Sequence, residues 1–70
     1  MHVRISQPDH LDDLVRYLRA TECTVEKHGD DLVEVSMPRA PSEDQARREV
    51  AIYLKAWQAM NPGTTADILD

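Results

Sequence analysis

Three histidines and one cysteine offer the nitrogen and sulfur atoms that zinc prefers as ligands in proteins. These residues are His2, His10, His28 and Cys23. Structural zinc sites usually take two ligands from one turn or from one face of a helix, and no pair among the four has that close spacing. The sequence therefore predicts no metal site and no metal cofactor.

Two groups of acidic residues supply oxygen atoms, but each has a simpler explanation. Asp9, Asp12 and Asp13 fall where a helix is expected to begin, and acids are common there because that end of a helix is positive. Asp30 and Asp31 lie in an expected turn, whereas a calcium loop holds about 6–8 oxygen ligands in a fixed frame. We interpret the first group as a helix start and the second as a turn.

Cys23 is the one candidate nucleophile of the thiol class. A reactive thiolate needs a nearby positive charge, and only Lys27 lies in the same expected strand. Cys23 also lies on the same face of the expected strand as Val25, which predicts that its side chain is buried. A phosphate-binding loop is excluded because Gly29 and Gly63 are the only glycines. We expect no catalytic residue and no enzymatic activity.

Three arginines near the expected start of the second helix offer contacts to phosphate: Arg39, Arg47 and Arg48. Glu43 and Asp44 lie four residues before Arg47 and Arg48, so intrahelical ion pairs are the simpler interpretation. The formal net charge of -5 repels nucleic acid, and no expected strand carries an aromatic residue on which a base would stack. We therefore expect no nucleic-acid partner.

The length and composition indicate one small domain in the cytoplasm. A chain of 70 residues has a thin core, and such chains often gain stability from disulfides, metals or a second copy. A single cysteine excludes an internal disulfide and favours a reduced compartment. No stretch has the pattern of an export signal or of a membrane span, so we expect no membrane partner.

The first third of the chain predicts a strand followed by a helix. Residues 1–6 alternate, with Val3 and Ile5 on the apolar face. Ser6 and Asp9 have the spacing of a helix cap, so a helix is expected to begin there. Its apolar stripe recurs at helical spacing, at Leu11, Leu14, Val15 and Leu18.

The middle of the chain predicts a hairpin. Residues 23–28 and 32–37 both alternate, and the turn-forming residues Gly29, Asp30 and Asp31 separate them. In the second of these strands, every other residue from Val33 to Met37 faces the core. The prolines in residues 38–41 then end the sheet and connect it to a second helix.

A second helix is expected from Ser42 to Met60, with a cap formed by Ser42 and Gln45. One apolar stripe follows it: Ala46, Val50, Tyr53, Leu54, Trp57 and Met60. Ile52 points away from this stripe. Tyr53 and Trp57 are therefore predicted to pack in the core.

Assembled in order, the elements predict an α+β fold of β-α-β-β-α type. A right-handed crossover through the first helix leaves room for the last strand beside the first. The expected fold is a two-layer sandwich, a three-stranded antiparallel sheet of order 1-3-2 with two helices on one face. Residues 1–63 form the single domain and residues 64–70 a flexible C-terminal tail. An alternative places the first strand on the other edge of the hairpin.

Three sequence segments carry a resemblance to known proteins: VRI at 3–5, VEKHGDDLVEV at 25–35, and the helix from Glu49 to Trp57. With the element order, they resemble small uncharacterised bacterial proteins, and a ferredoxin-like or ACT-like fold that lacks its last strand. This resemblance covers residues 1–61 and implies a fold, but no activity.

The outer edge of the first strand has no partner in this expected sheet. The tail near Ile68 could cover it, a second copy could pair with it, or Arg4 could keep it solvated. Pairing with a second copy is favoured because a small chain gains most from it. The expected function is thus a non-catalytic protein-interaction module that self-associates, with a possible interface at Val3, Arg4, Ile5 and Ile52. Its partner is itself, as a homodimer, or another protein. The alternative function is an ACT-like regulatory module that binds a small molecule.

Overall fold

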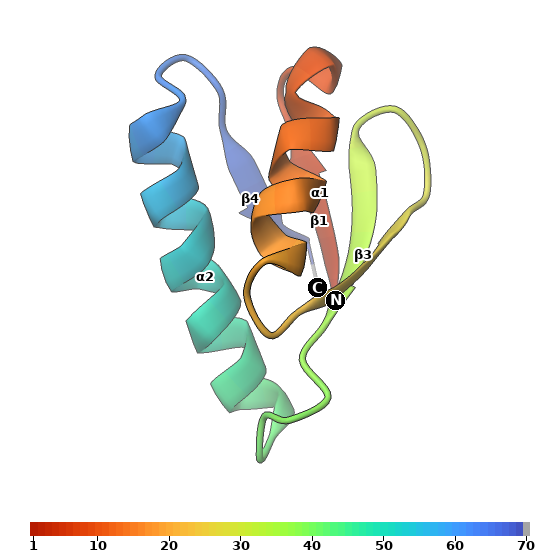
Figure 1. Ribbon diagram of the computed structural model, residues 1–70, viewed down its shortest axis with the longest axis vertical. Helices are drawn as coiled ribbons and strands as arrows, with labels where there is room; N and C mark the ends of the chain where they lie inside the picture. Colours follow the sequence, from red (N-terminus) through yellow and green to blue (C-terminus); the bar gives the residue numbers. More distant parts are fainter. Residues whose placement is uncertain (70) are drawn as a thin grey trace.

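Four antiparallel strands form one sheet, and two helices cover the same face of it (Figure 1). The structure is a computed structural model and describes residues 1–69. Along the chain the elements are β1 (His2–Ile5), the short 3-10 helix η1 (Pro8–His10), α1 (Leu11–Arg19), β2 (Thr24–Lys27), β3 (Leu32–Ser36), α2 (Glu43–Met60) and β4 (Ala66–Ile68). The strand order is β2-β3-β1-β4. The predicted α+β class is confirmed, with β1 beside β3, but the three-stranded sheet is wrong.

The fourth strand lies in residues 64–70, where we predicted a flexible tail. β4 pairs antiparallel with β1, and Ala66 lies opposite Ile5. A strand of three residues has too short a pattern to be recognised in the sequence. The prediction for residues 64–69 is therefore corrected, and Asp70 lies outside the described residues.

The turn before β4 depends on a glycine and on the residues that follow β1. Gly63 has a φ of 90°, in the left-handed region that favours glycine. The carbonyl of Gly63 accepts a hydrogen bond from the side-chain amide of Gln7 (3.0 Å). The Ser6 hydroxyl accepts a hydrogen bond from the N–H of Thr65 (2.9 Å). These contacts bring the end of the chain alongside β1.

The core lies between the helices and the sheet, as the alternating pattern predicts. Trp57 is fully buried near the middle, together with Val3, Leu14, Leu18, Val33, Val35 and Val50. Two members of the predicted α2 stripe differ from expectation. Met60 is 61% exposed because α2 ends there, and Tyr53 is only half-buried at the edge of the core. Burial of the Trp57 ring was predicted and is confirmed.

The two predicted helix caps have different outcomes. The Ser42 hydroxyl accepts a hydrogen bond from the N–H of Gln45 (3.1 Å), which confirms the cap of α2. Ser6 does not cap a helix, because its hydroxyl bonds to Thr65 and η1 precedes α1. Residue spacing alone did not distinguish a local cap from this contact with a distant strand.

Candidate interaction surface

Both edges of β1 are occupied, so β1 offers no edge to a partner. β3 pairs with one side of β1 and β4 with the other. The side chains of Val3 and Ile5 are buried in the core, at 0% and 2% exposure. The proposed interface at the first-strand edge is therefore corrected: the edge that seemed free is covered by β4.

The other two predicted interface residues lie on the surface, on opposite sides of the molecule. The Arg4 side chain is exposed on the sheet face away from the helices, and its Nε lies 3.6 Å from a carboxylate oxygen of Asp31. Ile52 is 65% exposed on the outer side of α2. The structure thus does not bring the four predicted residues together.

The hydrogen bonds between β1 and β4 define which way the backbone of β4 faces. At one end of the pair, the N–H of Ser6 donates to the carbonyl of Thr65 (2.9 Å). At the other end, the N–H of Leu69 donates to the carbonyl of His2 (2.9 Å). In an antiparallel pair, bonded and non-bonded positions alternate along each strand. Residues 65, 67 and 69 therefore direct their backbone polar groups toward β1.

The outer edge of β4 is covered at Ala66, which is only 4% exposed, and open at Ile68, which is half-buried. Ala66 and Ile68 direct their N–H and C=O groups away from β1, and no other described strand lies on that side. β4 contains no proline, and its one charged residue is Asp67. An edge of this kind is a template for pairing with another chain.

The opposite edge of the sheet, at β2, is better guarded. The carbonyl of Val25 accepts a hydrogen bond from the guanidinium of Arg19 at the end of α1 (2.9 Å). Lys27 forms an ion pair with Asp12 of α1, and the hydrogen bond and charge of Lys27 hold the Asp12 pKa below its ordinary value of 3.8. Charged side chains at an edge are a common defence against pairing. The two edges are therefore not equivalent.

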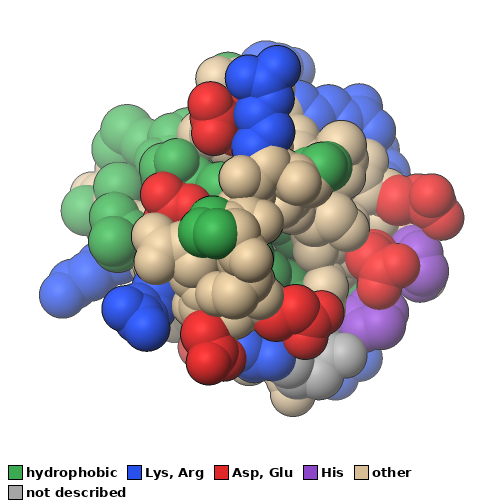
Figure 2. Space-filling model, turned by 90° about the horizontal axis from the view of Figure 1, so that it is seen from below, with side chains coloured by type: hydrophobic (Ala, Val, Ile, Leu, Met, Phe, Trp, Pro, Cys, Tyr) green, Lys and Arg blue, Asp and Glu red, His purple; other side chains and the backbone are tan. Residues whose placement is uncertain are grey.

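Exposed apolar side chains gather over α2, on the left of Figure 2. Ile52 and Met60 are the largest exposed apolar residues of this helix, at 65% and 61% exposure. Ile52 faces away from the core, whereas Met60 is exposed because it lies at the end of α2. Isolated surface apolar residues are common, so this face carries less weight than the open strand edge.

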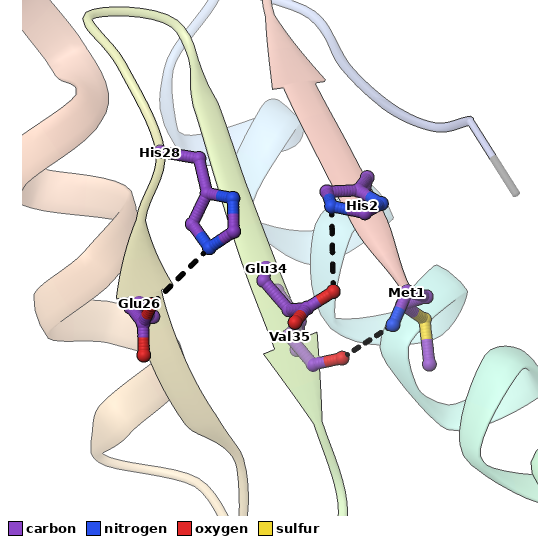
Figure 3. A network of polar contacts seen from close by, with 6 residues as sticks. All are labelled: Met1, His2, Glu26, His28, Glu34 and Val35. Carbon is purple, nitrogen blue, oxygen red and sulfur yellow. Dashed lines mark hydrogen bonds and ion pairs between the residues drawn. The ribbon is translucent and has the colours of Figure 1, made fainter.

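The sheet face away from the helices carries two imidazole–carboxylate pairs (Figure 3). Nε2 of His2 in β1 lies 3.3 Å from Oε2 of Glu34 in β3. Nε2 of His28 lies 3.2 Å from Oε1 of Glu26 in β2. The two imidazole rings are 5.6 Å apart and meet edge to face. Glu26 and Glu34 are direct cross-strand partners. Glu26 is 82% exposed, so solvent screens this network and each pair contributes little to stability.

This network was missed in the sequence, although the signal was present. His2 and His28 are distant in the chain, and the expected order already placed the third strand between the strands that lead to them. Strand parity puts Glu26 and Glu34 on the same polar face as the histidines. Spacing along the chain does not reveal such a network, because the register between strands decides which residues of a sheet lie together.

Neither the histidines nor Cys23 form a metal site among residues 1–69, where no suitable group of three His, Cys, Asp or Glu residues occurs. His10 ends η1, and Cys23 is buried just before β2. Cys23 borders a hollow that Arg39 also lines. Burial nevertheless raises the pKa of the Cys23 thiol, and the charges of Glu49 and Glu22 act in the same direction. The site disfavours a thiolate.

The ion pairs predicted within α2 do not form among the described residues. Neither Glu43 with Arg47 nor Asp44 with Arg48 is within ion-pair distance. Arg47 instead lines a hollow between β3 and α2.

Comparisons with known proteins add no relative. No protein-family model, no curated protein and no solved structure matches the chain. The resemblance to small bacterial proteins therefore stays a prediction. Within residues 1–69, no helix has both the length and the apolar character needed to cross a bilayer.

Proposed function

We propose that this protein is a small non-catalytic interaction module in which two copies pair through the outer edges of β4. The observation that carries the proposal is the unpartnered edge itself, where the half-buried Ile68 directs backbone N–H and C=O groups outward. Pairing of two such edges extends both sheets into one and satisfies these groups. Cys23 is buried, and its raised pKa disfavours the thiolate. This supports a module without nucleophilic catalysis.

A second copy is the partner that fits this edge best. Two identical strands pair antiparallel across a two-fold axis, so one short strand suffices as both donor and acceptor. A chain of 70 residues also has much to gain from an added interface. The interface between two three-residue strands is small, so we expect a reversible dimer with a Kd of about 10–100 µM.

The charge of Asp67 selects the register of this pairing. A two-fold axis through Asp67 would place two identical carboxylates directly opposite each other, which is destabilising. Registers centred on Ala66 or Ile68 avoid this contact. Ala66 is only 4% exposed, so the dimer is proposed to form around Ile68.

The finer fold assignment and the compartment belong to the same proposal. The order β-α-β-β-α-β and the strand order β2-β3-β1-β4 support a ferredoxin-like module that includes its last strand. The free thiol of Cys23 supports a reduced, cytoplasmic environment. The alternative, a regulatory module that binds a small molecule between two copies, has less support, because β4 supplies only Asp67 as a polar side chain.

Sedimentation equilibrium of two matched variants tests the pairing. Ile68→Ala and Ile68→Pro both lose the half-buried side chain, but only the proline variant loses the outward N–H. The wild type and Ile68→Ala should form concentration-dependent dimers, whereas Ile68→Pro should sediment as an 8.0 kDa monomer. Emission of Trp57 verifies that each variant is folded. Equal dimerisation of the two variants, or a wild type that stays monomeric up to about 1 mM, would disprove the proposal.

A further inference from the structure

A hollow of about 500 Å³ opens between the end of β3, the loop at 37–42 and the first turns of α2. Its volume lies within the range of about 300–1,000 Å³ that small-molecule sites occupy. None of its lining residues belongs to β4, so it is independent of the proposed dimer edge.

The inner part of this hollow is apolar. Val35, Met37 and Ala46 line it and belong to the buried core, with exposures of 0%, 7% and 7%. Ala40 of the connecting loop adds a half-buried methyl group. A ligand that enters the hollow therefore meets the edge of the hydrophobic core and gains from burying an alkyl group there.

Two side chains of opposite charge line the hollow, together with Met1, whose N-terminal ammonium donates a hydrogen bond to the carbonyl of Val35 (2.8 Å). Arg47 and Glu43 both line it, yet they form no ion pair with each other or with another described residue. Ser42 is already engaged in capping α2. The guanidinium of Arg47 is thus free to bind a carboxylate through two parallel hydrogen bonds.

We propose that this hollow binds a small aliphatic carboxylate. The alkyl chain lies against Met1, Met37 and Ala40, and the carboxylate pairs with Arg47. An aliphatic amine would place its positive charge beside Arg47, so charge as well as shape selects the ligand. Glu43, one turn before Arg47 on α2, repels an anion, so the effects of the two charges can be tested separately.

NMR titrations with hexanoate and with hexylammonium test the ligand class. Hexanoate should cause saturable shifts in the amide signals of Val35, Ala40 and Ala46, with a Kd in the millimolar range. Hexylammonium should bind at least about fivefold more weakly. Absence of saturable shifts up to about 20 mM hexanoate, or equal binding of the two ligands, would overturn the proposal.

Three single substitutions in α2 test the role of the charges. Arg47→Gln should weaken hexanoate binding about fivefold, and Glu43→Gln should strengthen it about twofold. Arg48→Gln removes a neighbouring positive charge that does not line the hollow, and it should leave binding unchanged. An Arg48→Gln variant as weak as Arg47→Gln would reduce the effect to overall charge and contradict the site. Circular dichroism verifies that all three variants fold.

Discussion

At the residue scale, Trp57 links the two helices. Its ring is fully buried, and its Nε1 donates a hydrogen bond to a carboxylate oxygen of Asp13 in α1 (2.9 Å). The indole therefore fills the core and also satisfies its polar atom, as a buried tryptophan must.

Two substitutions of Trp57 separate these roles. Trp57→Ala should lower the free energy of unfolding by about 3–5 kcal/mol, close to the whole stability of a chain this small. Trp57→Phe retains an aromatic ring but loses the hydrogen bond to Asp13, and should lose about 1–2 kcal/mol. Urea unfolding followed by circular dichroism measures both. A folded Trp57→Ala variant with an unchanged urea midpoint would show that the ring does not hold the core together.

At the element scale, β4 turns an exposed strand into a central one. It covers the free side of β1, and Ala66 and Ile68 add apolar contacts to the core. The turn at Gly63 and the contacts from Ser6 and Gln7 hold it in place. Residues 64–69 are therefore part of the folded unit.

A chain that ends at Gly63 tests this role directly. The shortened chain loses the β1–β4 hydrogen bonds and exposes the side of Ile5 that Ala66 covers. It should lose at least about 2 kcal/mol of stability, and partial unfolding at 25 °C would follow. Urea unfolding of the two lengths side by side gives the answer. Identical midpoints would mean that residues 64–69 form a dispensable tail.

The elements with long patterns could be predicted from the sequence, and the shortest one could not. The stripes of α1 and α2, the hairpin parity and the adjacency of β1 and β3 all follow from repeated spacing of apolar residues. β4 spans three residues, too few to show a period. Its position depends on distant contacts, such as the Ser6 hydroxyl with Thr65, that no local pattern encodes.

The candidate site, like the fold, could be predicted from the sequence only in part. We expected an open strand edge because a sheet that does not close has two outer strands. Its location was wrong by one strand, and this error assigned Val3 and Ile5 to a possible interface. The histidine–glutamate network was missed because the pair His2–Glu34 and the pair His28–Glu26 come together only through sheet register.

At the scale of the whole molecule, the sheet has one edge protected by charged side chains and one open edge. Arg19 and the ion pair of Lys27 with Asp12 occupy the β2 side, whereas β4 leaves the outward backbone groups of Ile68 available. The net charge of -5 opposes association of two copies, so added salt should favour it by screening. This asymmetry is the basis of the proposed dimer.

Amide hydrogen exchange at residues 66–69, measured at low and high protein concentration, tests this account most directly. At low concentration the N–H groups of Asp67 and Leu69, which face β1, should exchange slowly, while that of Ile68 should exchange fast. At high concentration Ile68 should become protected as the two edges pair. Fast exchange of the Asp67 and Leu69 amides, or of Ile68 at every concentration, would contradict the proposed dimer.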